Sequence, residues 1–173
     1  GAGGRGVFSD AEDIGITYTL SDDGKLVISG TGSIADDAFA GNTKITSVVI
    51  SEGVTGIGSG AFTGCTNLTS VTIPEGVTTI DGMTFGNCTS LTSVTIPGTV
   101  TSIEVQAFWN CSSLTSITIP ASVTSIGSGV FQGCTSLTSV KFSEGLTRIG
   151  DQTFGKCNAL ETIEIPASLT SIG

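Results

Sequence analysis

The sequence predicts a mostly β solenoid, in which short parallel strands stack on one another in successive coils. The first observation is an internal period of 23 residues, with six full repeats from Ile34 to Ser171. The second is the alternation of polar and apolar residues over four positions of a repeat, which is the period of a strand. The third is a proline directly after that run in four repeats, which ends a strand because proline has no N–H to donate.

The period is carried by columns of apolar residues that recur in register along the chain. A single repeat cannot bury its own apolar face, so units of this kind stack and bury a shared core. The columns that we expect to form this core are Ile34, Ile57, Ile80, Ile103, Ile126, Ile149 and Ile172; Phe39, Phe62, Phe85, Phe108, Phe131 and Phe154; Cys65, Cys88, Cys111, Cys134 and Cys157; and Leu68, Leu91, Leu114, Leu137 and Leu160.

One repeat, residues 57–79, illustrates the expected strand. Val71 and Ile73 should face the core, while Ser70 and Thr72 should face solvent. Pro74 should end this strand, and a second extended piece, residues 77–80, should close the coil. Neighbouring strands lie about 4.8 Å apart, so six rungs should form a rod on the order of 30 Å long.

The segment "AFTGC" at residues 61–65 predicts one short helical or 3₁₀ turn on the outer side of each coil. Gly and Asn tolerate the left-handed conformation that commonly ends such a turn. Lys156 departs from this pattern, so we expect the last repeat to turn differently. The column concerned is Gly41, Gly64, Asn87, Asn110, Gly133 and Lys156.

The two ends of the chain differ. Residues 1–33 predict a tail and a β-hairpin that caps the first rung, because Asp23-Gly24 is a strong hairpin signal between two alternating runs. Residues 34–173 then hold the six repeats and the start of a seventh. Because the sequence stops within that seventh repeat, we expect the chain to be a fragment of a longer repeat protein.

The five cysteines predict a buried column of small side chains. Zinc needs four ligands that converge, whereas these residues should lie in a line along the rod. Neighbouring Cβ bonds should run parallel, which disfavours disulfides. We therefore expect native protein to contain no fast-reacting thiol. Asn42 replaces cysteine in the first repeat.

Composition and charge exclude several classes of function. The net charge is −9, and no Lys or Arg occurs between Ile45 and Val140, so nucleic acid and anionic membranes are disfavoured as partners. No apolar run reaches the roughly 20 residues that span a bilayer. The chain has no histidine, which removes the commonest general base. We expect no enzymatic activity, no cofactor and no metal.

The repeat pattern IG-x-x-AF-x-GC-x-x-L-x-x-V-x-IP resembles the BspA-type leucine-rich repeat. The resemblance covers Ile34 to Gly173. It implies a leucine-rich-repeat solenoid of the horseshoe (α/β) type that is mostly β, with the parallel sheet on the concave side and the short turns on the convex side. It also implies a secreted or cell-surface protein without catalytic activity, used in adhesion and binding a host matrix or cell-surface protein.

The outward positions of the parallel sheet are the candidate binding residues. Variation among the Ser and Thr residues concentrates near the C-terminal end, where Lys141 and Glu164 occur, so that end is the expected centre of recognition. Trp109 is added because tryptophan is a favoured contact residue, although its column should lie on the convex turn. The candidate set is Ser70, Thr72, Ser93, Thr95, Ser116, Thr118, Ser139, Lys141, Thr162, Glu164 and Trp109.

Two other functions fit the sequence. The rod could be a structural spacer or assembly element of a larger surface protein, and an anchor or catalytic domain in the parent chain would favour that interpretation. A flat Ser/Thr ladder at about 4.8 Å spacing would also suit ice binding. Lys141 and Glu164 interrupt that ladder, so ice binding is the remoter alternative.

Overall fold

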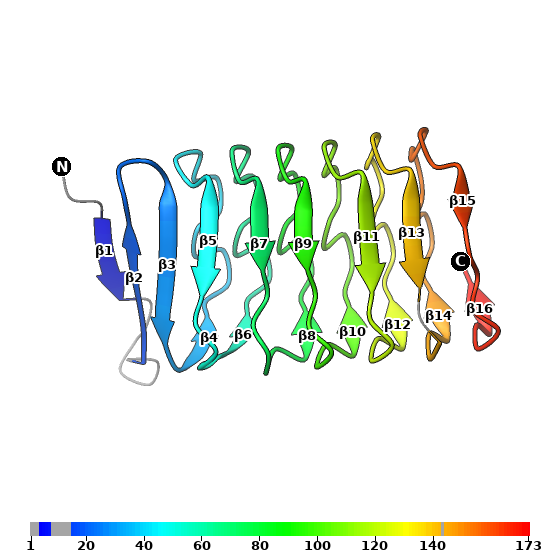
Figure 1. The fold of residues 1–173 in the computed structure, drawn as a ribbon, viewed down its shortest axis with the longest axis horizontal. Helices are drawn as coiled ribbons and strands as arrows, with labels where there is room; N and C mark the ends of the chain where they lie inside the picture. The colour runs from blue at the N-terminus through cyan, green and yellow to red at the C-terminus, as the bar shows by residue number, and fades with distance from the viewer. Residues whose placement is uncertain (1–3, 8–14, 143) are drawn as a thin grey trace.

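The chain forms a rod of stacked coils with its two termini at opposite ends (Figure 1). This computed structural model describes residues 4–7, 15–142 and 144–173. The predicted mostly β solenoid is confirmed. Asp10, Glu12 and Asp13, which contribute to the acidic N-terminal region of the sequence, lie outside the described residues, as does Ser143.

One strand of each coil contributes to the front of the rod (Figure 1). Pairing is parallel and joins residues 23 positions apart, as in Ser70 with Ser93. The register keeps each column in line, because equivalent residues of successive repeats become direct neighbours. The front strands are β5 (Ser47–Ile50), β7 (Ser70–Thr72), β9 (Ser93–Thr95), β11 (Ser116–Ile119), β13 (Ser139–Phe142) and β15 (Thr162–Ile163).

A second set of short strands closes each coil behind the first. These strands also pair in parallel, and all but the last place an isoleucine of the 23-residue column into the core, with Ile80 1% and Ile103 1% exposed. Ile172 of the last strand was expected in the core but is 60% exposed. The set is β4 (Gly32–Ile34), β6 (Val54–Ile57), β8 (Thr79–Ile80), β10 (Ser102–Ile103), β12 (Ser125–Ile126), β14 (Arg148–Ile149) and β16 (Ser171–Ile172).

The N-terminal end is capped by antiparallel strands. β2 (Ile16–Leu20) and β3 (Lys25–Gly30) form the expected hairpin, and its turn places Gly24 at φ 90°. β3 then pairs in parallel with β5, so it acts as an incomplete first rung. β1 (Gly4–Val7) adds a further antiparallel strand outside β2. The cap therefore ends the parallel stack by reversing the strand direction.

The core is a set of side-chain columns that run along the rod. The six phenylalanine rings stack nearly parallel, with centroids of neighbours 5.5–6.0 Å apart. Tyr18 of the cap meets the first ring, Phe39, edge-on at 5.2 Å. The predicted inward positions are confirmed, since Val71 is 3% and Ile73 2% exposed.

The outer turns differ from the prediction, because none of the described residues is helical. Instead, alternate N–H groups of the turn donate to carbonyls of the neighbouring rung. Ala61 and Thr63 donate to carbonyls three residues back, whereas Phe62 donates to Thr84 of the next rung. A helix directs all these bonds along one turn, so a turn that shares them with its neighbour cannot extend into one.

Two columns of the turn adopt positive φ. The predicted column is left-handed in all six repeats, and Lys156, at φ 58°, conforms; the expectation that it turns differently is wrong. The local bonds on either side of it, from Gly155 to Gln152 and from Cys157 to Phe154, match those of the other turns. Sequence reasoning missed the second column, because its residue types are mixed: Asp37, Gly60, Met83, Gln106, Gly129 and Gln152.

Threonine hydroxyls link neighbouring rungs beside the strands. Thr69 and Thr92 each donate from the side chain to the carbonyl of the residue 23 positions earlier. Thr101 and Thr124 do the same beside the second set of strands. The recurring threonines of "LTSVTIP" and of the following "VTS" therefore satisfy backbone carbonyls that the ladders leave partly free.

The energetic cost of a side chain at the left-handed position can be measured by comparing two glycines that differ in backbone conformation. An added Cβ meets nothing within 4 Å at Gly41 or at Gly98, but only Gly41 has positive φ, 72°. Gly41→Ala should lower the free energy of unfolding by about 1–2 kcal/mol. Gly98→Ala should leave it unchanged or raise it by about 0.4–1 kcal/mol, because alanine restricts the unfolded chain.

Urea unfolding followed by circular dichroism measures both variants. Equal effects of the two substitutions would contradict the assignment of a left-handed position at Gly41.

Candidate binding face

The outward positions of the front strands form one continuous row. All ten Ser, Thr, Lys and Glu candidates on these strands are exposed, from Ser70 and Thr72 to Thr162 and Glu164. Most alternate with buried neighbours, as Thr72 does with Val71 and Ile73, whereas Val94 and Ile163 are partly exposed. Because the strand period places successive side chains on opposite faces, the row follows directly from the register of the core.

The structure gathers most of these residues around two shallow grooves. One, of about 400 Å³, is lined by Ser139, Val140, Lys141, Thr162 and Glu164 and so unites the four C-terminal candidates.

The second groove has the same volume, about 400 Å³, and lies between β9 and β11. It includes Ser93, Thr95, Ser116 and Thr118 in its lining. The lining holds hydroxyl groups and backbone but no charged side chain, unlike that of the C-terminal groove.

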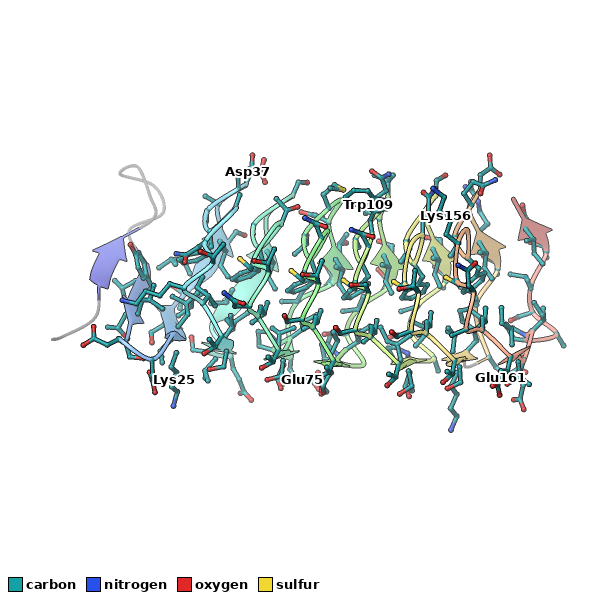
Figure 2. The ribbon with its side chains drawn as sticks, turned by 90° about the horizontal axis from the view of Figure 1, so that it is seen from above. Lys25, Asp37, Glu75, Trp109, Lys156 and Glu161 are labelled. Atoms are coloured by element: carbon teal, nitrogen blue, oxygen red, sulfur yellow. The ribbon has the colours of Figure 1, made fainter. Side chains whose placement is uncertain are left out.

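Trp109 lies apart from the other candidates. Figure 2 shows it on the side of the rod that carries Asp37 and Lys156, opposite Glu75 and Glu161. Its side chain is partly buried. The structure therefore agrees with the expected turn position and separates Trp109 from the front row.

Val49 is a surface residue that sequence reasoning missed. It occupies the column of Thr72 and Thr95 but is apolar, and 49% of it is exposed. With Glu52 and Glu75 it helps to line a third groove of about 350 Å³. The sequence does mark this residue. Val49 breaks the Ser/Thr pattern of the outward column at the N-terminal end, as Lys141 does at the C-terminal end.

Carboxylates gather at the opposite edge of the rod, next to the turns. Burial raises the pKa of Asp81 above its usual value, and the negative charges of Asp36 and Glu104 raise it further. Asp36 also accepts a hydrogen bond from the backbone N–H of Ser59 in the next rung. Within the described residues, no group of three or more His, Cys, Asp and Glu side chains is arranged to hold a metal ion.

The cysteine column is buried, as predicted, and makes a contact that the sequence did not indicate. Each thiol donates a hydrogen bond to the carbonyl of the phenylalanine 26 residues earlier, for example Cys88 to Phe62 at 3.2 Å. Cys157, in the last full rung, is only partly buried. The five thiols are free and serve to link the rungs.

The thiols should therefore react in two classes, and the partial exposure of Cys157 replaces the expectation that native protein contains no fast-reacting thiol. We expect one fast-reacting group per native molecule with a thiol reagent such as dithionitrobenzoate, and five after unfolding. Peptide mapping should place the fast group at Cys157, and Cys157→Ala should abolish the fast phase. A fast phase that persists in this variant would contradict the burial of the other four.

Alkaline pH should destabilise the rod. Burial raises the pKa of Cys65 to about 11 and that of Cys134 to about 12, from an ordinary value of 9.0. The folded state thus holds these protons more tightly than the unfolded state. The contribution of these thiols to the free energy of unfolding is therefore fully present below pH 9.0 and is lost as the pH rises toward 12.

Chemical unfolding at pH 8 and at 10.5 measures this loss. The loss should be smaller in Cys134→Ala than in wild type. Cys157→Ala should reduce the loss less, because burial also raises the pKa of the partly buried Cys157. A pH dependence identical in all three proteins would contradict the assignment to buried thiols.

The described residues form no helix that is long and apolar enough to cross a bilayer. No curated protein matches the chain. Solved structures do. A leucine-rich repeat protein from Bacteroides ovatus is 27% identical with a TM-score of 0.69, and the match covers 100% of this chain and 54% of that one.

A leucine-rich cell surface protein from Faecalibacterium prausnitzii is 29% identical with a TM-score of 0.68, over 96% of this chain and 55% of that one. This chain therefore spans about half the length of these two proteins. A T. pallidum leucine-rich repeat protein, 24% identical with a TM-score of 0.67, covers 88% of this chain and 90% of its own and shares the fold.

The model of the BspA-type leucine-rich repeat region matches residues 32–132 and 103–173, with six copies of the repeat. Proteins built from such repeats commonly bind other proteins and are typically not enzymes. The 23-residue columns, the stacked rungs and this match agree, and the chain belongs to the BspA-type leucine-rich repeat family.

Proposed function

We propose that the chain is an extracellular protein-binding module that uses the front face of its solenoid for adhesion, at the cell surface or after secretion. Solenoids of stacked repeats offer an extended surface along one side, which suits the recognition of a folded partner. The similar protein from Faecalibacterium prausnitzii carries the description of a cell surface protein, which supports this location.

The C-terminal groove is the observation that carries the proposal. Lys141 and Glu164 bring opposite charges to equivalent positions of adjacent rungs, whereas the candidates on β7, β9 and β11 carry only neutral hydroxyl groups. Both side chains are exposed. A partner can therefore interact with their charges at little desolvation cost, before the two surfaces are in close contact. Charged groups at such positions give specificity and raise association rates.

The test is capture of human extracellular matrix and cell-surface proteins on immobilised chain, followed by affinity measurement of any captured protein. Lys141→Ala combined with Glu164→Ala should weaken binding at least about tenfold, equivalent to roughly 1.4 kcal/mol. Ala40→Lys is the matched control, because Ala40 is exposed in the Trp109 column, away from the front strands. It should leave the affinity unchanged.

The central part of the face is tested with Thr72→Lys, Thr95→Lys and Thr118→Lys in one variant. Unchanged binding here, with loss in the C-terminal variant, would confine the site to the C-terminal groove. Binding that only Ala40→Lys disrupts would contradict the front face as the binding surface.

A further inference from the structure

The ladder of hydrogen bonds along the front strands is interrupted at one step, where a step means the junction between two adjacent rungs. β9 pairs with β7 and β11 pairs with β13, but no ladder joins β9 to β11, although the structure describes every residue of these strands. The front strands therefore form two separate sheets (Figure 1).

The interruption removes bonds that the other steps make. The amide of Thr92 donates to Thr69, and that of Thr138 to Thr115, with the hydroxyl of each donor repeating the bond. Among the described residues, no such bond joins Thr115 to Thr92. In the same way, Ile73 donates to Thr95, while the equivalent bond from Ile96 to Thr118 is missing at this step.

A side chain beyond the strands gives independent evidence of the same opening. Thr99 and Ser168 each donate a hydroxyl bond of 2.8 Å to a carbonyl 22 residues earlier, on the preceding rung. Ser122 occupies the equivalent position next to the interrupted step. Its hydroxyl is buried and has no hydrogen-bond partner among the described residues. The opening thus continues from the strand into the following loop.

The opening reaches the core but stays on one side of the rod. Val94 is partly exposed, whereas its neighbours in the column, Val71 and Ile117, are 3% and 4% exposed. The groove of about 400 Å³ between β9 and β11 lies over this position.

Behind the opening, the same two rungs remain joined. Ser102 pairs with Ser125 in the second set of strands, and the rings of Phe85 and Phe108 stack at 5.5 Å. On the turn side, the amide of Asn87 donates to the carbonyl of Trp109.

A second interruption, between β6 and β8, provides an internal comparison. These strands of the rear set are also unpaired in the described structure. Here, however, Val77 is 0% and Ile80 1% exposed, so the core is closed. The loss of a ladder alone does not open the rod, and the step between β9 and β11 is different in kind.

We propose that the step between β9 and β11 is a joint, at which the front of the rod opens and closes while the rear strands and turns hold the rungs together. In the closed form, Thr115 and Ile96 make the bonds that their equivalents make at other steps, and Ser122 bonds to Val100. In the open form, Thr115 and Ile96 lack these bonds, the buried hydroxyl of Ser122 has no partner among the described residues, and Val94 is partly exposed. The motion changes the shape of the central front face and goes beyond the proposed binding role.

Amide hydrogen exchange with single-residue resolution tests the open form. The amides of Thr115 and Ile96 should exchange at least roughly tenfold faster than their equivalents Thr92, Thr138 and Ile73, because protection requires a stable hydrogen bond. Equal protection at Thr115 and Thr92 would overturn the proposal.

A metal clamp tests closure, because the parallel Cβ bonds of equivalent residues disfavour a disulfide. Thr95→His with Thr118→His crosses the joint, and Thr72→His with Thr95→His crosses the paired β7–β9 step as a matched control, in a chain that has no other histidine. With Ni²⁺, exchange at Thr115 should slow toward that of Thr92 in the first variant and remain fast in the control. Binding of Ni²⁺ that does not slow Thr115, or binding by the control but not by the first variant, would show that the strands do not close.

Discussion

The hydrogen bond between residues one repeat apart is the interaction on which the rest of the structure depends. Strands, turns and side chains all use it, from the ladder of β7 and β9 to the hydroxyl of Thr69. Such bonds require that equivalent groups meet at a constant offset. A repeat of constant length meets this condition, so the chain can vary a side chain in one repeat but not the number of residues in it.

The same constraint explains how far the sequence predicts the fold. The core columns and the outward row follow from the period and from strand alternation, and both were correct except at Ile172, which is exposed in the last rung. The outer turn was predicted wrongly, because some of its hydrogen bonds join two repeats. Phe62 donates to Thr84 of the next repeat, and the sequence of a single repeat does not indicate that partner. The thiol bonds to phenylalanine carbonyls were hidden for the same reason, since donor and acceptor lie 26 residues apart.

The candidate face shows a similar division. Exposure of Thr72 or Lys141 could be read from their place in the alternating run. The grooves could not, because they depend on how far neighbouring strands separate, and the repeats around β9 and β11 are nearly identical in sequence to those that pair closely. Only the breaks in the outward column, Val49, Lys141 and Glu164, mark in the sequence where the surface differs along its length.

The left-handed columns of the outer turn have a consequence for how this architecture can change. Non-glycine residues such as Met83 and Gln106 hold positive φ at an energetic cost, and their N–H groups donate to the next rung, which helps to offset it. These positions lie on the turns, away from the front strands. Overall stability can therefore be raised or lowered through the turn residues while the row that meets a partner keeps its composition, so the two properties are free to evolve independently.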